Sequence, residues 1–153
     1  MTPLRVRQAA DADVAVLAVL RRAWAEEQAG GPLTDPDFEQ NFADWYAAER
    51  TRRITWLVEL GGEPVGMLNL VLFRRMPKPG RPISQWGYVS NLFVRAGHRD
   101  RGVGRLLLDA ALDHARVHDF DRVVLSPTDR SVPFYRRAGF GDADTLLLHP
   151  MTP

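Results

Sequence analysis

The segment from Trp86 to Leu125 constrains the fold more than any other part of the chain. Trp86–Val94 has the composition of a strand, Gly102–His118 has the periodicity of an amphipathic helix, and Val123–Leu125 is a short apolar run. A strand, a helix and a strand in succession predict two parallel strands joined by a right-handed crossover. The helix should pack on the sheet through one face, which carries Val103, Leu106, Leu107, Ala110, Ala111 and His114.

The remaining patterns extend this unit to a mixed α/β sheet (α+β) with helices on both faces. Further strands are predicted at Leu4–Gln8, Ile54–Leu60, Pro64–Phe73 and Thr145–His149. Further helices are predicted from a cap at Asp11 to about Gln28, over Asp37–Glu49, and over Val132–Ala138 with Asp129 or Ser131 as the cap and Gly139 as a left-handed end. The element order is βααβββαβαβ, and no repeat or linker divides residues 1–153, so we predict a single domain.

The composition excludes several classes of function. The 153 residues carry a formal net charge of +1, which is too balanced for nucleic acid or an anionic membrane to be the main partner. The chain has no cysteine, which excludes a cysteine nucleophile, a thiolate metal site and a disulfide scaffold. No run of about 18 apolar residues occurs, and the N-terminal segment lacks the apolar core of a signal peptide, so we expect a cytoplasmic protein.

The start of the long helix combines two glycines with three arginines, in the sequence Arg-Asp-Arg-Gly-Val-Gly-Arg at Arg99–Arg105. The first N–H groups of a helix have no helical partner and lie at the positive end of its dipole, so they suit an anion. Glycines there let a ligand approach the main chain. The segment lacks the Gly-Lys-Ser/Thr of a P-loop, and Leu107 occupies the third glycine position of the dinucleotide fingerprint. A phosphate or pyrophosphate of another kind of ligand is therefore predicted at this site.

Arg-x-x-Gly-x-Gly at Arg99–Gly104 resembles the acyl-CoA pyrophosphate motif of the GNAT N-acetyltransferase superfamily. The resemblance extends over most of the chain, because Tyr88–Val94 is similar to the family's fourth strand and Ser126–Phe140 to its second signature, a helix with Phe-Tyr-x-x-x-Gly-Phe. One departure is Asp100, where family members usually carry glycine. We expect its carboxylate to face solvent, away from a pyrophosphate.

The resemblance implies that Trp86–Val94 and Val123–Leu125 splay apart and that pantetheine satisfies the freed main-chain groups like an added strand. It implies acetyl-CoA as the acyl donor, with no metal. The residues expected to contact this cosubstrate are Leu92, Phe93, Val94, Arg99, Asp100, Arg101, Gly102, Val103, Gly104, Arg105, Ser126, Ser131, Phe134 and Tyr135. For Ser126, stabilisation of a turn before Pro127 is an equal alternative.

The implied reaction is attack of a primary amine on the thioester in a ternary complex, since no cysteine can carry an acyl group. Tyr135 matches the tyrosine to which the family assigns protonation of the departing thiolate. A neutral phenol with a pKa of about 10 suits that role. The base stays open. Asn91 stands near the position where family members often carry a glutamate, and it can only position a water molecule; Glu26, Glu27, Tyr88 and a chain of waters are alternatives.

The acceptor is a small molecule, an amino-acid derivative or a peptide amine, and its binding residues are expected among Trp24, Glu27, Trp45, Tyr46 and Tyr88. His114 and His118 have the spacing of a metal pair, but no accompanying carboxylate motif supports a metal site. Two other functions stay open: a non-catalytic acyl-CoA sensor and an interaction domain. A homodimer is compatible with each reading, with Thr145–His149 as the pairing edge.

Overall fold

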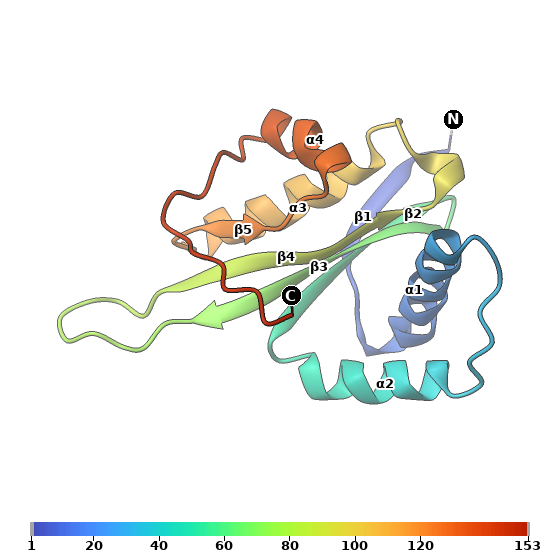
Figure 1. Ribbon diagram of the computed structural model, residues 1–153, viewed down its shortest axis with the longest axis horizontal. Coiled ribbons are helices and arrows are strands. Elements are labelled where there is room, and N and C mark those ends of the chain that lie inside the picture. Colours follow the sequence, from blue (N-terminus) through green and yellow to red (C-terminus); the bar gives the residue numbers. More distant parts are fainter. Residues whose placement is uncertain (1, 153) are drawn as a thin grey trace.

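One five-stranded sheet in the order β1-β2-β3-β4-β5 organises the computed structural model, which describes residues 2–152. Its strands are β1 (Leu4–Gln8), β2 (Arg53–Leu60), β3 (Glu63–Arg74), β4 (Gln85–Val94) and β5 (Val123–Leu125). The pairs from β1 to β4 are antiparallel, and β4 and β5 are parallel. The predicted crossover unit is therefore confirmed, and Figure 1 shows it at one edge of the sheet.

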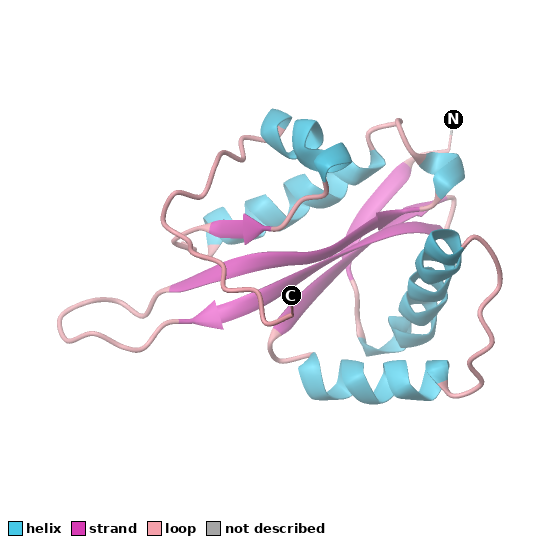
Figure 2. Ribbon diagram, viewed as in Figure 1, coloured by secondary structure: helices cyan, strands magenta, loops and turns pink. Residues whose placement is uncertain are grey.

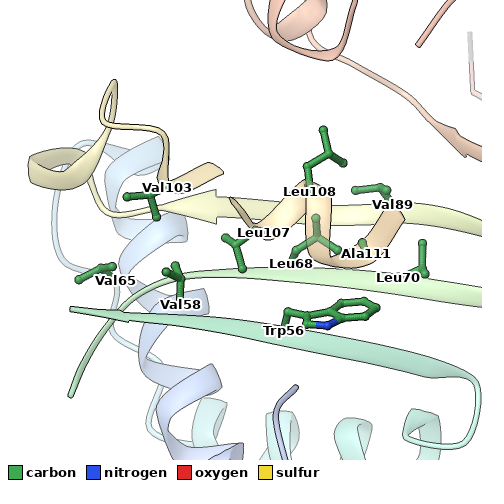
Figure 3. Packing of buried hydrophobic residues seen from close by; sticks show 10 residues of the cluster. All are labelled: Trp56, Val58, Val65, Leu68, Leu70, Val89, Val103, Leu107, Leu108 and Ala111. Carbon is green, nitrogen blue, oxygen red and sulfur yellow. The ribbon is translucent and has the colours of Figure 1, made fainter. Parts of the chain in front are cut away.

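Helices cover both faces of the sheet, as predicted (Figure 1). They are α1 (Val14–Ala29) and α2 (Phe38–Glu49) on one face, and α3 (Val103–Val117) and α4 (Val132–Arg137) on the other. The core is correspondingly split by the sheet. One cluster joins Leu17 and Leu20 of α1 to Leu57, Met67 and Phe93 of the strands. The other lies between α3 and the strands, and Figure 3 shows its side chains.

The face that α3 presents to the sheet is rotated slightly from the prediction. Val103, Leu107 and Ala111 are buried as expected. Leu108 is fully buried, although it was not assigned to the face, and Leu106 is 40% exposed. The apolar stripe of α3 is wider than predicted because residues around α4 and Phe120 also pack on this cluster.

The predicted cap of the first helix is corrected, whereas Ser131 occupies the N-cap position of α4 as one of the two predicted candidates. Asp11 lies in a short 3-10 turn before α1 and forms an ion pair with Arg50 at 2.7 Å, so it does not cap the helix. The carboxylate that closes this turn belongs to Asp13, whose Oδ2 accepts a hydrogen bond from the Ala10 N–H at 2.7 Å. Before α4, Ser131 accepts the Thr128 N–H at 3.0 Å, which stabilises the turn that leads into the helix.

The strand predicted at Thr145–His149 is wrong. Residues 145–149 lie outside any strand, and Figure 2 shows the segment after α4 as a loop. Leu147 and Leu148 are almost completely exposed, so their apolar alternation is not buried against the sheet. The proposed pairing edge of a homodimer is therefore absent from this structure. Within residues 2–152, no helix combines the length and the apolar character needed to cross a membrane.

Candidate active site

A β-bulge in β4 organises the site. Asn91 pairs with Asn69 of β3, while Val89 pairs with Leu70, so Ser90 is an extra residue in β4. In a regular strand neighbouring side chains point to opposite faces, but a bulge places two successive residues on one face. The Ser90 hydroxyl accordingly donates to Asn91 Oδ1 at 2.9 Å, and both residues line one cavity on the α1 and α2 face.

The parallel pairing stops at the same bulge. β4 pairs with β5 only from Gly87 to Val89, so the rest of β4 has no partner strand on that side. The Arg95 N–H donates to the Val65 carbonyl at 2.8 Å on the β3 side. Because antiparallel residues alternate in the direction of their hydrogen bonds, Leu92 and Val94 present their backbone groups at the opened edge. The splayed pair of strands is present, and these are the two residues whose main chain was predicted to lie there.

The turn before α3 explains both unusual residues of the glycine motif. Asp100 has φ +59° and Gly102 has φ +81°, both in the left-handed region. Glycine adopts this conformation freely, and aspartate is among the few other residues that tolerate it. Asp100 is exposed, as the predicted solvent-facing carboxylate requires. Backbone geometry therefore accounts for glycine or aspartate at both positions.

Gly104 has a different role. A Cβ at Gly104 would meet the Phe134 ring at 3.6 Å and Val94 Cγ2 at 3.7 Å, which are ordinary contacts. Neither its backbone conformation nor the packing of the protein therefore demands glycine. The place that a side chain would fill lies between the first turn of α3, the end of β4 and α4. This is where a ligand at the α3 amides would need access to the main chain.

The three arginines of the motif have different partners. Arg105 donates to Asp109 and to the Arg137 carbonyl, and so ties α3 to the end of α4. Arg99 donates from Nε to the Val94 carbonyl at 2.9 Å and pairs with Glu27 at 2.6 Å. Arg101 is exposed and forms no ion pair within residues 2–152. The positive charge near the α3 amides is thus partly neutralised by the protein itself.

Tyr135 lies in α4 and packs on the cluster beneath α3. Its ring makes edge contacts with Phe134 and Phe140, at centroid distances of 5.0 and 5.7 Å. Burial raises the pKa of Tyr135 above its ordinary value, because the phenolate loses hydration. The hydroxyl therefore keeps its proton at neutral pH and suits the predicted role of proton donor.

Both carboxylates at the end of α1 have structural partners. The hydrogen bond from Arg99 lowers the pKa of Glu27, which keeps it ionised and weakens it as a base. Glu26 Oε1 accepts the Leu33 N–H at 3.2 Å and lies 3.8 Å from Arg22. These contacts favour a role for both carboxylates in holding α1 and its following loop.

A cavity of about 440 Å³ lies between α1, α2 and the sheet; we call it the α1–α2 cavity. Its lining residues are Leu17, Arg21, Phe38, Asn41, Phe42, Trp45, Tyr46, Arg53, Thr55, Met67, Asn69, Ser90 and Asn91. The cavity thus brings together Trp45, Tyr46 and Asn91, three of the residues predicted for the site. Burial raises the pKa of Tyr46, with Asp11 and Asp13 adding to the effect. A size of this order suits a small molecule.

Sequence reasoning missed Arg53, the polar centre of this face. Its Nη1 donates to Asn69 Oδ1 at 3.3 Å and to the Ser90 hydroxyl at 3.2 Å. Its guanidinium lies 4.9 Å from the Trp45 ring centroid, and its Nε pairs with Glu49 at 3.2 Å. The available signal was Asn69, a buried amide within an otherwise apolar strand.

Other predicted residues lie apart from the cavity. Trp24 stacks on Phe93 at 5.6 Å, and Phe93 is buried with its backbone on the β3 side of β4. The Tyr88 hydroxyl donates to Ser126 Oγ at 3.1 Å, across β4 and β5. The Ser131 hydroxyl is engaged with Thr128. In residues 2–152 no three side chains of His, Asp or Glu gather in a group that could hold a metal ion.

The fold, a mixed sheet whose parallel strands open beside a glycine-started helix, is the one that the resemblance implied. Residues 17–140 match the acetyltransferase (GNAT) family. The chain therefore belongs to the GNAT family of acetyltransferases.

Individual proteins extend this comparison. A glucosamine 6-phosphate N-acetyltransferase from Trypanosoma brucei brucei is 27% identical over 79 residues, which are 52% of this chain and 52% of that protein. The chain thus spans about half the length of this curated relative. A predicted acetyltransferase from Clostridium acetobutylicum, solved with acetyl-CoA, has a TM-score of 0.76 at 16% identity and 97% coverage of both chains. A GCN5-related N-acetyltransferase from Ralstonia eutropha JMP134 has a TM-score of 0.74 at 25% identity, over 99% of this chain and 100% of that one.

Proposed function

We propose that this protein is an N-acetyltransferase that moves an acetyl group from acetyl-CoA to a primary amine of a small molecule. One observation carries the proposal: β4 holds both halves of such a site. Its backbone at Leu92 and the Val94 N–H face the opened edge, where the Val94 carbonyl accepts a hydrogen bond from Arg99 Nε. Its side chains at Ser90 and Asn91 line the α1–α2 cavity. A donor on the open edge and an acceptor in the cavity would meet at this strand.

The chain's residues fit the donor. The backbone N–H groups at the start of α3, around Val103 and Gly104, would hold the pyrophosphate, and the uncrowded Cβ position of Gly104 leaves the main chain accessible. The amides of pantetheine would pair with the main chain of Leu92 and with the Val94 N–H, since the Val94 carbonyl already accepts a hydrogen bond from Arg99 Nε. Phe134 would flank the pantetheine arm where that arm passes between α3 and α4.

The reaction would proceed by direct attack in a ternary complex, because the chain has no cysteine to form an acyl-enzyme. The neutral amine nitrogen forms a bond to the thioester carbonyl carbon, and the carbon–sulfur bond breaks. The thiolate takes the proton of the Tyr135 hydroxyl, and Tyr135 regains a proton from solvent. The amine proton leaves to water positioned by Asn91, since Glu27 is held as the anionic partner of Arg99. Positioning of both reactants supplies much of the rate.

The relatives support an amine acceptor of low molecular weight. The trypanosomal relative is a glucosamine 6-phosphate N-acetyltransferase, and the cavity here has a volume suited to a small molecule.

Thiol release tests the activity. The protein is incubated with acetyl-CoA and a panel of primary amines, and free CoA is followed with a thiol reagent beside the thermal shift that acetyl-CoA alone produces. We expect a thermal shift and amine-dependent thiol release. A shift without turnover on any amine would favour the acyl-CoA sensor, for which Asn91 in place of an acid is the supporting feature. Absence of both would overturn the proposal.

A further inference from the structure

The α1–α2 cavity contains two arginines and no carboxylate among its lining residues. The two arginines differ in how they are neutralised. Arg53 pairs with Glu49 and donates to Asn69 and Ser90, so its charge and its hydrogen bonds are already used. Arg21 forms no ion pair within residues 2–152. One uncompensated positive charge therefore lines the cavity.

Arg21 is also held in place. Its guanidinium carbon lies 4.8 Å from the Trp24 ring centroid, and Trp24 is itself stacked on the buried Phe93 at 5.6 Å. Arg21 follows Leu17 by one helical turn, on the side of α1 that packs toward the sheet. The side chain is half-buried there rather than extended into solvent. A preorganised, partly desolvated guanidinium binds a carboxylate or phosphate more strongly than a mobile surface cation does.

The other walls define the rest of the ligand. Phe38, Phe42, Trp45 and Tyr46 of α2 offer aromatic surface. Ser90 and Asn91 supply neutral polar groups where the cavity meets β4. We propose that the acceptor is a small amine that also carries an anionic group, a carboxylate or a phosphate, which binds Arg21 while its apolar or ring portion lies against the α2 aromatics. This inference rests on the proposed function, which supplies the amine and its direction toward β4.

Two matched pairs of ligands test the inference, because each pair differs in the anionic group. They are phenylalanine against phenethylamine, and glucosamine 6-phosphate against glucosamine. Dissociation constants come from tryptophan fluorescence, to which Trp24 and Trp45 contribute, with and without CoA. We expect the anionic member of at least one pair to bind about tenfold tighter or more. The pair with the larger preference identifies the anion as carboxylate or phosphate.

Variants connect the preference to Arg21. Arg21→Gln should reduce the preference to about one by weakening the anionic member alone, and Arg21→Lys should retain part of it because the charge remains. Arg116→Gln, on α3 and paired with Asp113, is the matched control and should change neither value. Circular dichroism melting checks that each variant folds. Equal binding of both members of both pairs, or a preference that persists in folded Arg21→Gln, would overturn the inference.

The same data separate this inference from the proposed function. If acetyl-CoA binds and the amines without an anionic group are acetylated as well as those with one, the proposed anion site is wrong and the acetyltransferase activity stands. If acetyl-CoA neither binds nor releases thiol, the proposed function fails, while the ligand pairs measured without CoA still report on the anion site.

Discussion

Arg99 forms a two-pronged ion pair with Glu27: Nη1 lies 2.6 Å from Oε1, and Nη2 donates to Oε2 at 2.8 Å. The pair connects the end of α1 to the segment that leads into α3, across the edge of the sheet. The same guanidinium donates from Nε to the Val94 carbonyl. One arginine therefore links the acceptor side of the protein to the strand that would carry the donor.

Glu27→Gln should leave the pH profile of turnover unchanged. The carboxylate has a lowered pKa and is engaged with Arg99, so it is a poor proton acceptor near neutral pH. The free energy of unfolding should fall by less than about 1 kcal/mol, since both side chains are more than a third exposed. The measurement is kcat/KM against pH for both proteins. Loss of the acidic limb in the variant would instead identify Glu27 as the base.

Alanine should separate the roles of the two glycines. Gly102→Ala should lower the free energy of unfolding by about 1–2 kcal/mol, because φ is +81° there. Gly104→Ala should leave stability unchanged or raise it by up to about 1 kcal/mol, because helix propensity rises and the new Cβ makes ordinary contacts.

Acetyl-CoA affinity completes this comparison. We expect Gly104→Ala to weaken binding measured by calorimetry, although its melting temperature does not fall. Unchanged affinity in Gly104→Ala would mean that the ligand does not approach the main chain at this residue.

Tyr135→Phe should lower kcat by about 10²- to 10⁴-fold with little change in acetyl-CoA affinity, if the hydroxyl protonates the thiolate. Because burial raises the pKa of Tyr135, the wild-type protein should keep the proton donor through pH 7–9 and lose it only above about pH 10. Steady-state kinetics across pH checks both points. A parallel loss of kcat and affinity would indicate that the ring acts through packing.

Asp13 should make stability depend on pH under acidic conditions. Hydrogen bonds from Arg7 lower the pKa of Asp13 to about 2, with the Ala10 N–H contributing. A carboxyl group whose pKa is lower in the folded protein than in the unfolded chain stabilises the fold at every pH above its unfolded-state pKa. This contribution disappears as pH falls from about 4 to about 2. Asp13→Asn should therefore unfold more easily at pH 6, on the order of 1–2 kcal/mol, with a smaller difference near pH 2. Urea denaturation at both values checks this; an equal difference at both would contradict the assignment.

Most elements were predictable because local patterns and tertiary packing agree. The Leu4–Gln8 and Val123–Leu125 strands were predicted with their observed bounds, and the other helices and strands up to α4 differ by a few residues at their ends. The failure at residues 145–149 has a physical cause. Alternating apolar residues form a strand only where a sheet edge accepts them, and Leu147 and Leu148 have none in this structure.

The site was predictable where it depends on the backbone. The glycine motif predicted an accessible main chain at the start of the helix, and Gly102 and Gly104 do lie at the N-cap and in the first turn of α3. The positive φ of Gly102 was not predicted. The cavity was less predictable, because its polar centre depends on long-range register. Arg53, Asn69 and Ser90 come from three strands, and no spacing in the sequence reports that they meet.

The extra residue at Ser90 couples the two sides of β4. Because the bulge shifts the alternation of β4, one extra residue sets both the two side chains that line the α1–α2 cavity and the peptide groups that face the opened edge. Under the proposed function, the register of β4 would therefore fix the groups that face the acceptor and those that face the donor together. A change in the helices and loops around the cavity would then alter the acceptor that fits there, while the edge of β4 that would bind the donor keeps its register.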